Sequence, residues 1–143
     1  MAEREDVIFE FLEASGLEPR RVQEKLVQFW YKEERYYCRF VDQKQAVRIF
    51  NPRVWRVETH EEFGIATFVA NNMNRDTFGA KLFMNEVDDH VYIVADIFFA
   101  ELETLRLAFI DYMNAMNWAI GEFRDRAEAA TEGDSHPELP DSG

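Results

Sequence analysis

The side chains that could do chemistry in this chain are few and lie far apart in the sequence. The histidines are His60, His90 and His136, and there is one cysteine. A metal site needs several ligands that converge on one ion, as two histidines one helical turn apart can. Residues 60–62 (His-Glu-Glu) are consecutive at an expected helix start, so their side chains would point around the helix instead. We therefore predict no metal site.

The sequence also lacks a recognisable nucleophile or cofactor motif. Cys38 lies in the aromatic run RYYCRF, a pattern typical of a buried and inert thiol. Ser15 lies at an expected helix end and Ser135 in a C-terminal tail, so neither fits a nucleophile elbow. The glycines are isolated, which argues against a glycine-rich phosphate loop. We predict no catalytic residues, no cofactor and no enzymatic activity.

A cluster of polar residues is the densest in the chain. It consists of Asn71, Asn72, Asn74, Arg75 and Asp76. The amides could bind a ligand, but asparagine is also common where helices end, and an arginine there can neutralise terminal carbonyl groups. The structural interpretation is the one we favour.

The overall charge restricts the classes of partner. The formal net charge is -12 at pH 7, and such an excess repels nucleic-acid phosphates and anionic membrane surfaces. We predict neither nucleic acid nor membrane as a partner. A protein partner of basic character fits the charge, as does a merely solvated acidic surface. Since neither a secretory leader nor a membrane-spanning apolar run is evident, we expect a cytoplasmic protein.

The elements that must position these residues alternate between helical and strand patterns. Apolar side chains on one face predict a helix over residues 4–16. Residues 20–32 suit either a helix or a strand over 25–31. The strand is favoured because two short aromatic and β-branched runs, ERYYCRFV and QAVRIF, follow. Three such runs predict an antiparallel meander that ends at the turn signal of residues 51–52, Asn-Pro.

The second half of the chain predicts a helix, a hairpin and a long helix. Thr59 and Glu62 form a capping box, which predicts a helix over residues 60–74. The runs GAKLFMNE and HVYIVADI around an acidic turn predict a hairpin. Apolar residues then recur every three or four positions over residues 98–127, as in one long amphipathic helix.

These elements predict one α+β domain. Its order is α-β-β-β-α-β-β-α, with a single antiparallel sheet of about five strands, three helices and a long C-terminal helix. Residues 1–130 form the domain in this interpretation. Residues 131–143, which are rich in glycine, proline and acidic side chains, form a disordered tail.

The second half of the chain resembles a known family. The stretch FVANNMNRDTFGAKLFMNEVDDHVYIVADI, residues 68–97, followed by the long apolar helix, is similar to the YbjN family of bacterial sensory transduction regulators. That family ends its central helix on an asparagine-containing run, and continues with two strands around an acidic turn. It shares the fold of type III secretion chaperones. The resemblance implies a small, acidic, often dimeric protein that binds peptide segments or other proteins, without enzymatic activity.

The expected strands carry apolar side chains on both faces, whereas a sheet covered on one side should alternate apolar and polar residues. Either the long helix covers the excess or some apolar surface is left for a partner. The candidate partner or dimer surface consists of Trp30, Phe83, Tyr92, Val94, Ile110, Met113, Trp118 and Ile120.

Two functional hypotheses follow. The first is a chaperone-like or adaptor protein that acts as a homodimer and binds a protein or peptide segment along this surface. The alternative is a regulatory domain in bacterial signal transduction, which binds a protein partner without delivering it to a secretion apparatus.

Overall fold

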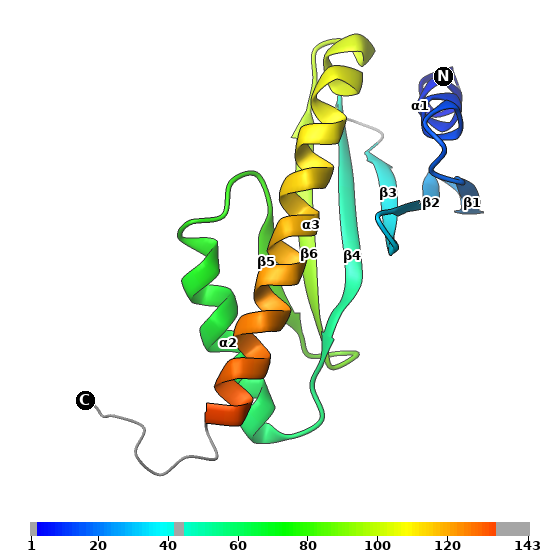
Figure 1. The fold of residues 1–143 in the computed structure, drawn as a ribbon. Helices are drawn as coiled ribbons and strands as arrows, with labels where there is room; N and C mark the ends of the chain where they lie inside the picture. The colour runs from blue at the N-terminus through cyan, green and yellow to red at the C-terminus, as the bar shows by residue number, and fades with distance from the viewer. Residues whose placement is uncertain (1–2, 42–44, 134–143) are drawn as a thin grey trace.

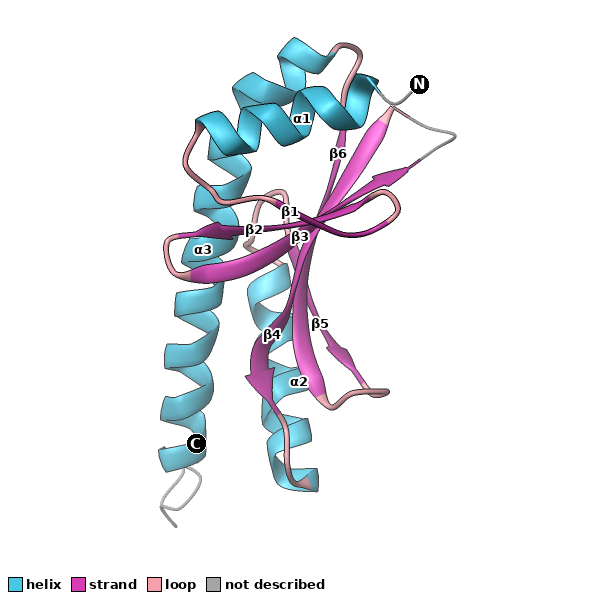
Figure 2. Ribbon diagram, turned by 90° about the vertical axis from the view of Figure 1, so that its right-hand side faces the viewer, coloured by secondary structure: helices cyan, strands magenta, loops and turns pink. Residues whose placement is uncertain are grey.

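The computed structural model describes residues 3–41 and 45–133. All three helices lie on the same side of one antiparallel sheet (Figures 1 and 2), as the predicted α+β class requires. The helices are α1 (Glu3–Ala14), α2 (His60–Asn74) and α3 (Leu102–Gly133). The strands are β1 (Arg20–Gln23), β2 (Leu26–Tyr31), β3 (Glu34–Val41), β4 (Ala46–Arg56), β5 (Lys81–Asn85) and β6 (His90–Phe98).

The sheet has six strands in the order β1-β2-β3-β4-β6-β5, one more than the expected five. The ambiguous residues 20–32 form two strands, because the chain turns between them at Lys25, whose φ is 63°. β1 has four residues, all exposed, and its register with β2 shifts between Arg21 and Gln23. Figure 2 shows that β1, β2 and β3 run almost across the direction of β4, β5 and β6, so the sheet is strongly twisted.

β4 does not end at Asn51-Pro52, which corrects the predicted turn. The pairing of β3 with β4 stops at Phe50, and the pairing of β4 with β6 shifts register between Asn51 and Trp55. Proline has no N–H group to donate, so it is tolerated at a bulge. The Asn51 side chain stabilises the bulge by accepting the Arg53 N–H at 2.9 Å. The turn signal therefore marks a bend inside a long strand.

α2 has the predicted limits and both ends are hydrogen-bonded. Thr59 Oγ1 accepts the Glu62 N–H at 3.1 Å, and the Glu62 carboxylate accepts the Glu58 N–H at 2.7 Å. At the other end, the Asn74 side chain donates to the Leu82 carbonyl at 2.7 Å and accepts the Leu82 N–H at 2.8 Å. The favoured structural interpretation is confirmed for Asn74, which joins the end of α2 to β5.

α3 buries the predicted stripe but begins later than expected. Phe98 is the last residue of β6, paired with Ala46, and the helix starts at Leu102. The residues that pack into the core at less than 3% exposure are Phe109, Met113, Met116, Ala119, Ile120, Phe123 and Ala127. The helix continues to Gly133, past the predicted start of the tail. Residues 134–143 of that predicted tail lie outside the described part of the chain.

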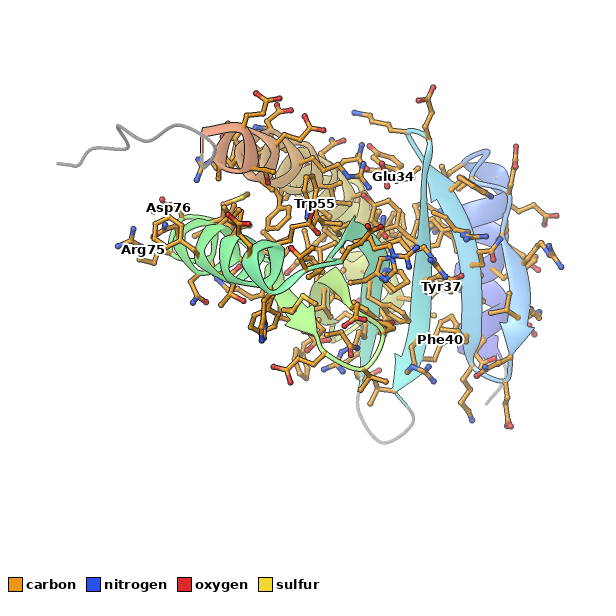
Figure 3. The ribbon with its side chains drawn as sticks, turned by 90° about the horizontal axis from the view of Figure 1, so that it is seen from below. Glu34, Tyr37, Phe40, Trp55, Arg75 and Asp76 are labelled. Carbon is orange, nitrogen blue, oxygen red and sulfur yellow. The ribbon has the colours of Figure 1, made fainter. Side chains whose placement is uncertain are left out.

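Polar contacts also tie α3 to the strands at the rim of this core. The hydroxyls of Tyr31 and Tyr36 donate to the side-chain oxygens of Asn114 and Asn117. Arg124 Nη1 lies 2.6 Å from Glu34 Oε2, and Figure 3 shows Glu34 beside α3. These contacts anchor the β2–β3 hairpin to the helix at fixed points, which apolar packing alone does not specify.

Candidate functional site

The face of the sheet that points away from the helices carries aromatic side chains on several neighbouring strands. Burial alternates along β3 and β6, so that every second residue faces the helices and the others face outward. We call this second set the outer face. The outer face from β2 to β6 includes aromatic, charged and apolar side chains: Trp30, Arg35, Tyr37, Arg39, Arg48, Phe50, Lys81, Phe83, Tyr92, Val94 and Asp96.

The aromatic rings of the outer face contact each other across neighbouring strands. Tyr37 and Phe50 stack with centroids 5.4 Å apart, and Phe83 and Tyr92 lie 5.3 Å apart. Phe83 is 42% exposed and Trp30 39%. Ring pairs held at cross-strand positions form a rigid apolar platform, because each ring limits the rotamers of its neighbour.

Two hollows deepen the outer face. The larger, of about 490 Å³, is lined by Arg39, Arg48, Phe50, Phe83, Tyr92 and Val94. The smaller, of about 180 Å³, lies where β4 bends and is lined by Trp30, Glu34, Arg35, Tyr37, Asn51, Pro52 and Arg53. The Asn51-Pro52 bulge therefore shapes the surface as well as the strand.

The charges beside the rings are mostly positive. Arg48 makes two contacts with Asp96, Nε to Oδ1 at 2.6 Å and Nη2 to Oδ2 at 3.0 Å, and this hydrogen bonding raises the pKa of Arg48. The Arg35 guanidinium lies 5.8 Å from the centre of the Trp30 ring. Burial, with the hydrogen bond to Asp88, raises the pKa of Tyr92 to about 12. Tyr92 therefore stays a neutral hydroxyl donor at physiological pH.

The structure brings together half of the residues predicted as a partner surface. Trp30, Phe83, Tyr92 and Val94 share the outer face. Ile110 and Trp118 are exposed on α3, on the opposite side of the molecule, at 39% and 59%.

Met113 and Ile120 correct the prediction, because they are 0% and 1% exposed. They lie on the side of α3 that packs against the sheet, whereas Trp118 points to the other side of the same helix. Both residues lie beside the apolar stripe in the sequence, and the sheet is broad enough to cover them as well as the stripe.

The sequence-based prediction missed Tyr37, Phe50, Arg39 and Arg48. The alternation of Tyr36-Cys38-Phe40 with Tyr37 and Arg39 along β3 was the available signal, since residues two apart share a face of the sheet. Which of the two sets faces the helices depends on tertiary packing. Figure 3 shows Trp55 between α2 and α3, with Arg75 and Asp76 across the molecule from Tyr37 and Phe40.

Cys38 and the potential metal ligands lie in surroundings that do not favour chemistry. Cys38 is buried, and burial raises the pKa of its thiol to about 12. Within residues 3–41 and 45–133, no three side chains of the His, Cys, Asp or Glu type are grouped so that they could hold a metal ion. None of the helices in the same part of the chain combines the length and apolarity that crossing a bilayer demands.

No family model matches the sequence, and no curated protein matches it. Solved structures do share its fold. A chain of the HopA1–SchA chaperone–effector complex is 9% identical with a TM-score of 0.60, covering 87% of this chain and 94% of that one. A chain of the ExsC–ExsE complex is 15% identical with a TM-score of 0.54, covering 82% and 91%.

A protein from Methanothermobacter thermautotrophicus is 14% identical with a TM-score of 0.57, covering 86% of this chain and 98% of that one. YbjN from E. coli aligns with a TM-score of 0.49 at 9% identity, and membership of that family stays a prediction. At these identities the likeness concerns the fold alone: this chain shares its fold with chains of the HopA1–SchA and ExsC–ExsE complexes and with the Methanothermobacter protein.

Proposed function

We propose that this chain is a non-enzymatic, chaperone-like or adaptor protein that binds a segment of a protein partner on the outer face of its sheet. The observation that carries the proposal is the aromatic platform of Trp30, Tyr37, Phe50, Phe83 and Tyr92, which no helix of the described chain covers. Tryptophan, tyrosine and arginine are the residues that contribute most at protein interfaces. The outer face has all three around its hollows.

The structural likeness supports this proposal. A chain of the same fold belongs to the HopA1–SchA complex, which is a complex of a chaperone with an effector. The fold is therefore one that accompanies binding of another protein. The enclosed side of the sheet, by contrast, is filled by buried core residues and leaves no room for a partner.

We further propose that the protein acts as a homodimer through its helical side. A second group of exposed apolar residues lies there, separate from the outer face: Phe68, Phe78, Leu107, Ile110 and Trp118. Phe78 is 90% exposed and lies next to a hollow of about 270 Å³ that Tyr112 and Ala115 also line. Two distinct apolar regions allow one to bind a second copy while the other binds the partner.

The proposal is tested by capturing partners from the host with the tagged wild-type protein and with Phe83→Glu. Because Phe83 is 42% exposed, its replacement should leave the fold intact, as circular dichroism would show. We expect the proteins retained by the wild type to be lost with Phe83→Glu. The matched control is Val87→Glu, in the β5–β6 turn, since Val87 is 95% exposed.

Equal retention by the wild type and Phe83→Glu would exclude the outer face as the binding site. Loss of retention with Val87→Glu as well would show that added negative charge, rather than the loss of the aromatic side chain, is responsible.

A further inference from the structure

The sign of the charge on the outer face is opposite to that of the whole chain. The net charge is -12, and α3 alone carries six acidic residues against three arginines. Among the residues that flank the Tyr37–Phe50–Val94 pairs on β3, β4, β5 and β6, the outward-facing charged ones are instead Arg35, Arg39, Arg48 and Lys81, with Asp96 as the acid. A further carboxylate, Asp88 in the β5–β6 turn, accepts the Tyr92 hydroxyl at 2.6 Å. The local field that a bound partner meets is therefore positive.

The register of the strands arranges the outer face in two parallel rows. Tyr37 pairs with Phe50, and Phe50 with Val94, which forms an apolar row across β3, β4 and β6. Two residues further along each strand, Arg39 pairs with Arg48, and Arg48 with Asp96. Same-face residues two apart along a strand are about 7 Å apart, so the charged row lies one side-chain width from the apolar row.

Among the residues that the structure describes, the charged row has two arginines and one carboxylate. Arg39 and Arg48 are directly opposite each other, an arrangement of like charges that destabilises a sheet. Asp96 contacts Arg48 through both carboxylate oxygens. Arg39 is exposed and has no carboxylate partner in the described part of the chain.

We infer that the partner segment, on the proposed protein-binding function, carries carboxylates beside apolar side chains: its apolar groups lie on the Tyr37–Phe50–Val94 row and a carboxylate pairs with Arg39. Arg39 lines the same hollow as Phe50, Phe83 and Val94. One segment can therefore reach both rows. An arginine that faces a carboxylate in two-point contact also gives orientation to the bound segment.

Single-stranded nucleic acid is the other ligand that aromatic and arginine side chains bind. Its many phosphates need several free cations, and here Lys81 Nζ is bonded to the carbonyls of Asn74 and Thr77, while Arg48 is paired with Asp96. A polyanion would also be repelled by the net charge of -12. A short peptide with one or two carboxylates meets neither obstacle to the same extent.

The experiment is a selection from a displayed library of random peptides against the full-length protein, with removal of peptides that also bind Phe50→Glu. We expect the enriched peptides to have net negative charge and apolar residues next to the acids. Enrichment of neutral or basic peptides, or no enrichment, would overturn the inference.

The same selection is then followed by titration of labelled enriched peptides into charge variants. Arg39→Glu should weaken binding of these peptides about ten-fold or more. A second version of each peptide, in which Lys replaces Asp and Glu, should bind Arg39→Glu better than it binds the wild type. Arg126→Glu is the control, because Arg126 is exposed on α3 and pairs with Glu122. Equal effects of the two variants would overturn the assignment to Arg39.

Two other occupants are outcomes of the same set of variants. An oligonucleotide that binds the wild type and is lost with Arg39→Glu would overturn the peptide inference, as would a dimer that Phe50→Glu converts to monomer in sedimentation. If host partners are lost with Phe83→Glu but their bound segments are basic, the charge inference fails and the proposed function stands. If Phe83→Glu leaves partner capture unchanged, the proposed function itself fails.

Discussion

Cys38 is a residue whose protonation should be visible in the stability of the whole protein. Burial raises the pKa of its thiol to about 12, whereas an unfolded cysteine ionises near pH 8.5. The unfolded state therefore loses its proton first, and the stability that the protonated thiol contributes is present below about pH 8.5 and lost as the pH rises towards 12.

We predict that Cys38→Ala is less stable than the wild type at neutral pH and that this difference shrinks as the pH rises. Between pH 8 and pH 10 the difference in free energy of unfolding should fall by about 2 kcal/mol, because only the wild type has the thiol to ionise. Urea denaturation of both proteins at several pH values measures this. A difference that stays constant up to pH 10 would mean that the thiol is accessible to water.

Arg124 is the second residue with a measurable structural role. Its guanidinium contacts Glu34 at 2.6 Å, the Val54 carbonyl at 2.8 Å and the Arg53 carbonyl at 3.2 Å. Arg124→Gln leaves a half-buried carboxylate and two carbonyls without this donor, so we predict a loss of about 1–3 kcal/mol in free energy of unfolding. Urea denaturation is again the measurement.

Arg126→Gln provides the comparison on the same helix. Arg126 pairs with Glu122 one turn away on an exposed surface, a contact that contributes about 0.5 kcal/mol or less. If the two variants lose similar stability, the contacts of Arg124 with β3 and β4 are not specific.

At the scale of elements, Asn74 connects α2 to β5 with one side chain. Its side-chain Nδ2 donates to the Leu82 carbonyl, and its Oδ1 accepts the Leu82 N–H. We predict that Asn74→Ala lowers the free energy of unfolding by about 1–3 kcal/mol, since it removes both hydrogen bonds. Asn71→Ala is the control: Asn71 is exposed on the same helix, and alanine favours helix, so the change should be neutral or slightly stabilising.

Local chemistry in the sequence determined the helices well, and the limits of strands less well. The Thr59–Glu62 box acts over four residues, and α2 has the predicted start and end. β1 was missed because its four exposed residues have no alternation. The bend at Asn51-Pro52 was predicted as a turn. At this point β4 stops pairing with β3 but continues to pair with β6, and a sequence does not show which strands pair.

The candidate surface was predictable in its kind and only partly in its members. Excess aromatic residues on expected strands indicated an uncovered sheet face, and Trp30, Phe83, Tyr92 and Val94 do lie on it. Met113 was predicted to lie on a surface, but it is buried. The width of helix that a sheet can cover depends on how its six strands assemble, which the pattern along α3 alone does not show. The net charge of the whole chain is negative, and a composition does not say on which face of the molecule each charged residue lies. The positive charge of the outer face could therefore not be predicted.

At the scale of the whole molecule, the proposed dimer gives a direct prediction. The wild type should have twice the mass of one chain in light scattering, and Trp118→Glu, on the helical side and 59% exposed, should shift it to the monomer. Phe83→Glu should keep the dimer mass, because Phe83 lies on the outer face. A monomeric wild type would contradict the proposal, and a monomeric Phe83→Glu would place the dimer contact on the sheet.

The two hydrogen bonds between Asn74 and Leu82 also affect how these molecules meet in a crowded solution. In an antiparallel strand, the N–H and C=O of one residue point to the same side, and Leu82 directs both to Asn74 rather than to β6. That side is the free edge of the sheet, where an unpaired strand invites addition of another molecule. The other edge, β1, is short, irregular and carries Arg20 and Arg21. A side-chain amide thus occupies one position of the next strand, which makes this edge a poorer template for the addition of another molecule.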